Sequence, residues 1–236
     1  MTYRLVLFLL SLLLSAPDAQ CQSTSLTSFI NCVDSQNGTD NLALNGRPYL
    51  PANLMAKGHP YFQINEWRPG IVYINGNSYP VNKLKYNLSN YQLIVKHQRP
   101  NGTTQKVVLS DLLIDSFYIG KHLFVNQDLI LSDEENSGYL EMILTDKLSF
   151  YRLQKKVFNA QYNKENPHGW FSNQKAIFYL LLDGKHHKIT KKKNFLACFP
   201  DDKVQIKKYL KDHSLKWKKM TKIQFAQLLK FCNDQI

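Results

Sequence analysis

Residues 69–88 read PGIVYINGNSYPVNKLKYNL, and this stretch decides the predicted fold. Asn75 and Gly76 separate two runs rich in β-branched and aromatic residues, and both accept the positive φ angles of a type I′ turn. Over residues 83–88 polar and apolar side chains alternate, with Leu84, Tyr86 and Leu88 on the apolar side. The stretch therefore predicts an antiparallel hairpin whose second strand has one buried and one solvated face.

The same pattern continues from Tyr61 to about Thr190. Further hairpin tips are predicted at Pro100, Asn101 and Gly102 and at Asp183–Gly184, each between apolar runs. Residues 107–119 and 138–153 are more continuously apolar, which indicates strands buried on both faces. The central part of the chain therefore predicts an antiparallel, hairpin-rich β-sheet.

The last part of the chain changes to helical periodicity. From Asp201 onward, one side of a helix carries Ile206, Tyr209, Leu210 and His213. A second helix is predicted to begin with a capping box at Thr221 and Gln224, and its apolar stripe is formed by Phe225, Leu228, Leu229, Cys232 and Ile236. The predicted class is α+β, with two C-terminal amphipathic helices packed on the sheet.

The chain is expected to form one domain after an export signal. Residues 1–21, MTYRLVLFLLSLLLSAPDAQC, combine one arginine, a ten-residue apolar run and a short polar exit, which is typical of a secretory signal peptide. Cleavage after Cys21 is favoured over lipidation of that cysteine. Residues 22–57 are expected to be irregular, residues 58–194 β-rich and residues 195–236 helical. The ten apolar residues of this segment are too few to span a bilayer core of roughly 30 Å, so the segment is not expected to be a membrane anchor. No transmembrane span is expected in the chain that remains after removal of the signal.

Three cysteines remain after the predicted cleavage, and their spacing matches no metal-binding pattern. Cys198 lies in an apolar run and Cys232 on the apolar side of the last predicted helix. Small core residues are favoured for both, and Cys198–Cys232 is the candidate disulfide if a bridge forms in the oxidising compartment. We expect no metal and no cofactor.

Common catalytic motifs are absent from the sequence: it has no G-x-S-x-G, no H-E-x-x-H, no phosphate-binding glycine loop and no C-x-x-C. His59 and Glu66 are the one acid–base pair close enough in sequence to consider, and a proline-directed turn followed by an aromatic strand is favoured over a catalytic role. The sequence therefore assigns no catalytic residue.

Positive charge concentrates towards the C-terminus. The chain has a formal net charge of +12, and residues 183–222 contain thirteen lysines against four aspartates. Such a field attracts polyanions, and lysine favours point-charge attraction over the bidentate recognition of bases, so no specific nucleic acid is expected. The candidate polyanion-binding residues are Lys191, Lys192, Lys193, Lys216, Lys218 and Lys219. The alternative is a solvated face that maintains solubility.

Several short motifs resemble those of uncharacterised exported proteins of Bacteroidota. They are AQCQ at 19–22, GHPYF at 58–62, WRPGIVYING at 67–76, LKYN at 84–87, FPDDK at 199–203, IKKYLKDHSLKWKK at 206–219 and LLKFCN at 228–233. The resemblance implies a location in a Gram-negative cell envelope or outside the cell. It carries over no activity and no catalytic residue.

The sequence thus favours a non-catalytic, periplasmic or secreted envelope protein that binds anionic envelope polymers or lipid headgroups. Two alternatives remain open at this point. One is an extracytoplasmic hydrolase with a dispersed site that includes His59 and Glu66. The other is a structural subunit of an envelope assembly, which an exposed apolar patch or an unpaired sheet edge would favour.

Overall fold

The structure is a computed structural model that describes residues 46–99, 101–131 and 138–234. The predicted signal peptide at 1–21, most of the expected irregular segment at 22–57, and Cys21 and Cys32 lie outside the described residues.

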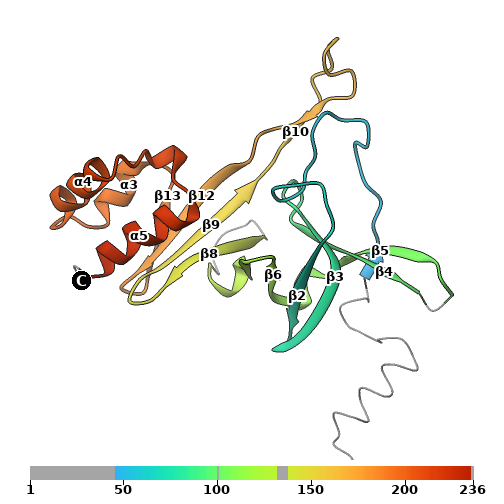
Figure 1. Ribbon diagram of the computed structural model, residues 1–236, viewed down its shortest axis with the longest axis horizontal. Coiled ribbons are helices and arrows are strands. Elements are labelled where there is room, and N and C mark those ends of the chain that lie inside the picture. Colours follow the sequence, from blue (N-terminus) through green and yellow to red (C-terminus); the bar gives the residue numbers. More distant parts are fainter. Residues whose placement is uncertain (1–45, 100, 132–137, 235–236) are drawn as a thin grey trace, which may run out of the picture. The chain divides into compact units, whose positions relative to one another are not determined.

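A single antiparallel sheet dominates the described residues (Figure 1). Its strands follow the spatial order β1-β5-β4-β3-β2-β6-β7-β8-β9-β12-β13, so most neighbours in space are also neighbours in sequence. The bounds are β1 Gly46–Pro48, β2 Arg68–Ile74, β3 Asn77–Asn87, β4 Gln92–Gln98, β5 Thr104–Leu109, β6 Ile114–Ile119, β7 His122–Asn126, β8 Tyr139–Thr145, β9 Ser149–Lys155, β12 Lys175–Leu182 and β13 Lys185–Ile189. A separate two-stranded ribbon pairs β10 Phe158–Asn159 with β11 Trp170–Phe171.

The predicted tight turns form as expected. Asn75 and Gly76 have φ angles of 49° and 77° and join β2 to β3, while Asp183 and Gly184, at 49° and 71°, join β12 to β13. Positive φ at both positions gives the turn a twist that matches the flanking strands. Gly102, with φ of 81°, lies in the β4–β5 connection. The hairpin-rich sheet is therefore confirmed.

The first part of the sheet encloses an aromatic core. Tyr86, Phe117 and Phe124 are almost fully buried, and the rings of Phe117 and Phe124 stack with centroids 4.9 Å apart. Phe62, from the segment before β2, packs edge-on against Phe124 at 5.1 Å. The core side of β3 is therefore the side predicted from its alternating pattern.

The opposite side of β3, predicted to be solvated, is covered only towards the end of the strand. Lys83 is exposed as predicted, whereas Lys85 and Asn87 are only 8% and 5% exposed. The segment before β2 folds back along the end of β3, where the Phe62 N–H donates to the Tyr86 carbonyl oxygen at 2.8 Å. The expectation of a wet face was therefore wrong at Lys85 and Asn87, because the segment that covers them is not adjacent to β3 in the sequence.

Helices follow the sheet, which confirms the α+β class in outline. The sequence predicted two helices, but the structure has three among the described C-terminal residues: α3 Lys192–Ala197, α4 Lys203–Asp212 and α5 Lys222–Asn233. Short 3-10 turns occur at η2 Asp111–Leu113, η3 Gln127–Leu129 and η4 Trp217–Lys219. The predicted capping box of the last helix is present, with the Thr221 N–H donating to Gln224 Oε1 at 2.9 Å.

A second apolar cluster combines these helices with the sheet. Phe195 of α3 and Phe225 of α5 are buried beside Phe150 of β9, with ring centroids 6.1 and 5.8 Å from that of Phe150. Contacts of α5 with β8 and of α3 with β13 join the two layers (Figure 1). None of the helices in the described ranges is long and apolar enough to span a membrane.

Two glycines offer a test of how closely the sheet is packed. Gly70 lies at the irregularity of β2, where a Cβ atom would meet the Tyr118 carbonyl oxygen and would lie 2.7 Å from Leu84 Cδ2. A Cβ at Gly76 would meet nothing within 4 Å.

We expect Gly70→Ala to lower the free energy of unfolding by about 3 kcal/mol, because the added methyl group would collide with its neighbours. Gly76→Ala should lower it by about 1 kcal/mol, because alanine disfavours the positive φ at this position. Urea unfolding measures both, and equal losses would contradict the packing described.

Candidate functional site

The six predicted lysines occupy two segments of the helical part. Lys191, Lys192 and Lys193 lie at the N-cap and first turn of α3, while Lys216, Lys218 and Lys219 precede or form η4. The rings of Phe195 in α3 and Trp217 in η4 lie 5.1 Å apart between centroids. This contact brings the two segments together, and we call the six lysines the lysine face.

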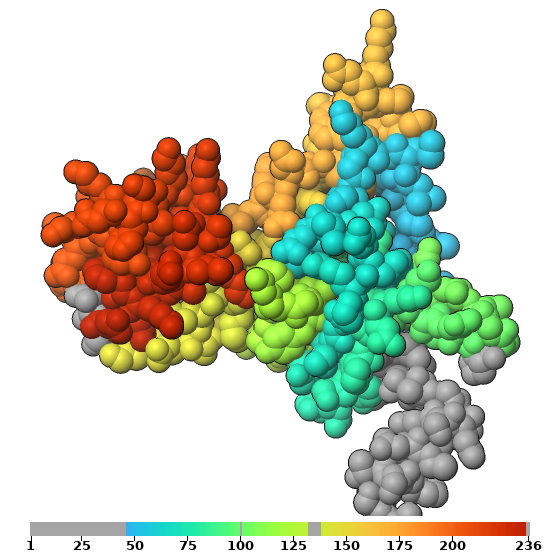
Figure 2. Space-filling model, in the orientation of Figure 1, coloured from blue at the N-terminus to red at the C-terminus, as the bar shows by residue number. Residues whose placement is uncertain are grey.

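The lysine face is exposed and electrostatically unbalanced. Five of its members are exposed and Lys192 is half-buried. None of the six forms an ion pair with a described residue. The first turn of α3 contains no acidic side chain, although the positive end of a helix favours one. In Figure 2 the orange-to-red C-terminal residues form a continuous part of the visible surface.

Trp217 does not project from the lysine face. Its indole packs against Phe195, at 5.1 Å between ring centroids, and edge-on against Phe225 at the same separation. Phe178 of β12 lies 6.1 Å away. Trp217 therefore belongs to the apolar cluster beneath the lysines, and the lysine side chains supply the outer polar surface.

Cys198 and Cys232 are both free thiols in the structure. The Cys198 thiol donates to the Asn194 carbonyl oxygen at 3.3 Å, which is a local contact within α3. Cys232 is fully buried, and burial, with a smaller effect of Asp202, raises the pKa of its thiol to about 12. The candidate disulfide is not formed, and the thiolate needed for reactivity is disfavoured at both positions.

His59 and Glu66 do not form an acid–base pair among the described side chains. His59 Nδ1 accepts a hydrogen bond from the Tyr61 N–H at 3.2 Å and lies 3.4 Å from Lys156 Nζ. Burial, followed by the charges of Lys156 and Lys85, lowers the pKa of His59. Glu66 is exposed and has no hydrogen bond to His59. The structure therefore gives the hydrolase alternative no catalytic pair at these residues.

A buried carboxylate that sequence analysis did not single out organises the centre of the sheet. Glu141 of β8 has no exposed surface. Its Oε1 accepts from His122 Nδ1 at 2.6 Å, and Lys222 Nζ of α5 lies 3.3 Å from the same oxygen. Its Oε2 accepts from Arg152 of β9, from Nη2 at 2.5 Å and from Nε at 3.0 Å. One carboxylate thus joins β7, β8, β9 and the first turn of α5.

Amide side chains extend this network in two directions. Gln154 of β9 donates to Glu141 Oε2 and accepts from the Gln174 amide. Beyond His122, the Gln63 amide nitrogen lies 3.1 Å from the imidazole Nε2. Each oxygen of the Glu141 carboxylate is therefore satisfied from more than one side, which is the condition for burying a charge in a folded protein.

The Glu141 network holds charge in place, and its chemistry is that of a structural ion cluster. Despite burial, which would raise it, the pKa of Glu141 falls to about 2 because the His122 hydrogen bond and the Arg152 and Lys222 charges favour the carboxylate. A carboxylate with this pKa does not donate a proton near neutral pH. The available sequence signal was a charged residue in the interior of each of two largely apolar strands, Glu141 in β8 and Arg152 in β9.

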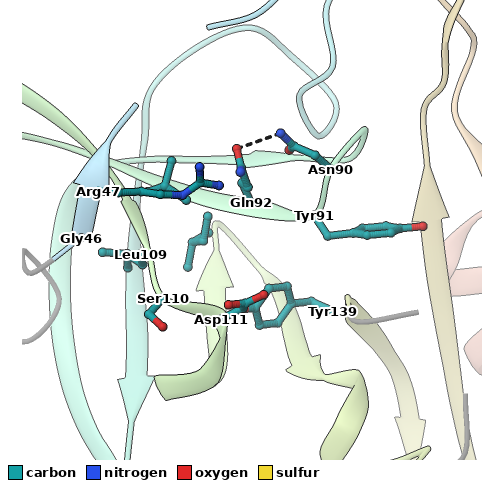
Figure 3. A pocket seen from close by; sticks show the side chains of 11 residues that line it. Gly46, Arg47, Asn90, Tyr91, Gln92, Leu109, Ser110, Asp111 and Tyr139 are labelled. Carbon is teal, nitrogen blue, oxygen red and sulfur yellow. Dashed lines mark hydrogen bonds between the residues drawn. The ribbon is translucent and has the colours of Figure 1, made fainter. Parts of the chain in front are cut away.

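A pocket of about 400 Å³ lies at the ends of β1, β4 and β5 (Figure 3). Arg47 and Asp111 contribute opposite charges to its lining and, within the described chain, make no ion pair with each other. Asn90 donates to Gln92 at 2.8 Å beside them, as the dashed line in Figure 3 shows. Its described lining residues include no histidine, cysteine or lysine, so neither His59 nor any member of the lysine face is among them.

No group of three or more histidine, cysteine, aspartate or glutamate side chains within residues 46–99, 101–131 and 138–234 is arranged to hold a metal ion. Comparisons with protein families, with curated proteins and with solved structures find no match for this chain. The proposed function therefore depends on the geometry and charge of the described side chains.

The Glu141 network predicts a defined response to acid. Because the pKa of Glu141 is lowered to about 2 from 4.5, its contribution to stability is complete above pH 4.5 and is lost as the pH falls towards 2. We expect Glu141→Gln to lower the free energy of unfolding at neutral pH by about 3 kcal/mol, because Arg152 and Lys222 lose their carboxylate partner. The variant should also lose less stability than the wild type between pH 4.5 and 2.

Urea unfolding at a series of pH values, followed by circular dichroism, measures both effects. Glu165→Gln is the matched control because Glu165 is exposed and outside the network. A Glu141→Gln protein with wild-type stability at neutral pH would show that the network contributes nothing.

Proposed function

We propose that this protein is an exported, non-catalytic protein of the cell envelope that binds anionic polymers or anionic lipid headgroups through its lysine face. The observation that carries the proposal is the lysine face itself: six lysines on two adjoining segments, mostly exposed and without a described carboxylate partner. The formal net charge of +12 supports it, because such a field raises the local concentration of polyanions.

Helix stability does not account for the position of these lysines. Three of them occupy the N-cap and first turn of α3, where a helix favours negative charge and disfavours positive charge. The other three lysines of the face lie in η4 or directly before it, and η4 contacts the same helix through Trp217 and Phe195. An arrangement that works against local electrostatics is better explained by attraction to an external anion.

The proposal gives the C-terminal helices one role in binding. Their apolar residues would form the amphipathic layer predicted from the sequence, turned towards the sheet, and their lysines would face outward. Burial of Ile206, Leu210 and Leu228 beside exposed Lys203, Lys207 and Lys211 supports this arrangement. Lysine ammonium groups act as point charges, so binding should depend on charge density and ionic strength more than on the sequence of a polymer.

The structural-subunit alternative receives less support from the sheet edge. β13 is the last strand of the sheet and has the sequence KHHKI, in which Lys185, His186 and Lys188 are exposed. Charged residues on an edge strand oppose pairing with another sheet. The exported location of the protein remains part of the proposal and is supported by the composition of residues 1–21.

Charge reversal tests the proposal directly. We expect the mature wild-type chain to bind lipopolysaccharide and vesicles containing phosphatidylglycerol at low ionic strength, with affinity falling steeply as salt increases. Changing all six lysines of the face to glutamate should weaken binding by more than about a hundredfold, since each lysine near an anionic surface contributes about 1 kcal/mol. DNA should bind without sequence preference.

The control carries the same change of charge elsewhere. It replaces six exposed lysines outside the face, and these are Lys57, Lys121, Lys147, Lys155, Lys164 and Lys175. Flotation or sedimentation of vesicles across a salt series measures both variants, and circular dichroism verifies folding. Equal loss of binding in the two variants would show that only net charge matters and would refute a localised lysine face.

A further inference from the structure

A second group of lysines lies on β3, β4 and β5, outside the lysine face. The strand register places Lys96 directly opposite Lys106. Lys85 is opposite Ile94, which is two residues from Lys96 on the same strand. Since side chains two residues apart in a strand share a face, all three lysines lie on one face of the sheet.

This arrangement has an electrostatic cost. Like charges directly opposite each other in an antiparallel pair destabilise it. Lys85 is also only 8% exposed, and its pKa is lowered by burial first and then by the charge of Lys106, with a further contribution from Lys96. Three ammonium groups are therefore held together where the sheet alone would disfavour them.

The neighbouring side chains orient the lysines without neutralising them. Lys85 Nζ donates to Asn65 Oδ1 at 2.6 Å and lies over the Trp67 ring, 4.9 Å from its centroid. Lys96 Nζ lies 6.0 Å from the same centroid. The exposed Glu66 is the carboxylate that acts on Lys85 through space, and it forms no ion pair with a described residue.

Positive charge continues beside this group. Lys156 Nζ donates to the carbonyl oxygens of His59 and Tyr61, each at 3.0 Å. Lys156 and Lys85 both lower the pKa of His59 through their charges. These carbonyl oxygens accept hydrogen bonds from the half-buried Lys156 ammonium group but carry no net charge that would compensate it.

The geometry points to an oxyanion site here, in which Lys96 and Lys106, backed by Lys85 and Trp67, bind a phosphate group. A dianion matches two adjacent exposed or half-exposed ammonium groups better than a carboxylate, and ammonium-to-phosphate hydrogen bonds are among the stronger ones in proteins. Inorganic phosphate and a phosphorylated sugar share this chemistry. The site does not depend on the lysine face, which lies on other elements.

Thermal unfolding and calorimetric titration with inorganic phosphate and with glucose 6-phosphate test the site. Sodium chloride at matched ionic strength is the control for non-specific effects of ionic strength on stability. We expect both phosphates to stabilise the wild type and Lys96→Gln/Lys106→Gln to weaken their binding at least tenfold. Tighter binding of the sugar phosphate would identify a phosphorylated saccharide as the source, and equal binding would identify the phosphate group alone.

Two controls separate this site from other cationic surfaces. Lys121→Gln removes an exposed lysine elsewhere in the same part of the chain and should leave phosphate binding unchanged. The six-lysine reversal of the lysine face should also retain it, so a failure of the proposed polyanion binding is distinguishable. The inference is overturned if phosphate gives no more stabilisation than chloride, or if the Lys96→Gln/Lys106→Gln protein binds it as tightly as the wild type.

A stability measurement without phosphate adds a second signature. Removing the repulsion between opposed ammonium groups should raise the thermal midpoint of Lys106→Gln at low ionic strength, and salt should reduce the gain. A lower midpoint together with unchanged phosphate binding would mean that the lysines serve the sheet alone, and would overturn the site.

Discussion

The carboxylate of Glu141 is the interaction on which the arrangement of the described chain depends. It lies on β8, which pairs with β7 on one side and with β9 on the other. His122, Arg152 and Lys222 reach it from β7, β9 and α5. Because a buried carboxylate is tolerated only when fully paired, these three elements are constrained to meet at one point. The helices that carry the lysine face are thereby tied to the sheet.

The lysines of the described chain differ in whether they have a carboxylate partner. Glu141 forms an ion pair with Lys222, one of the thirteen lysines within residues 183–222. No comparable carboxylate pairs with the lysine face in the described chain, and Lys96 and Lys106 oppose each other across β4 and β5. The described chain thus combines a buried carboxylate whose two oxygens are both paired with two surfaces whose lysines form no ion pair with a described carboxylate. Both proposals follow from that contrast.

Local rules made much of the fold predictable. Asn75–Gly76 and Asp183–Gly184 fix hairpins through their own dihedral angles, and Thr221 with Gln224 fixes a helix start through hydrogen bonds within one turn. The helix α3 was missed because six residues are too few to show a helical period. Burial of Lys85 and the pairing of Glu141 with Lys222 depend on segments distant in sequence, so alternation and composition do not reveal them. The lysine face was predicted because charge density is visible in composition.

We propose that anions bind the helical part at the lysine face. Hydrogen–deuterium exchange of the mature chain, with and without lipopolysaccharide at low ionic strength, tests it without altering the protein. We expect the protection gained on binding to be greatest in residues 191–193 and 216–219 and to disappear at high salt. Binding with protection confined to other segments, or binding that is insensitive to salt, would contradict it.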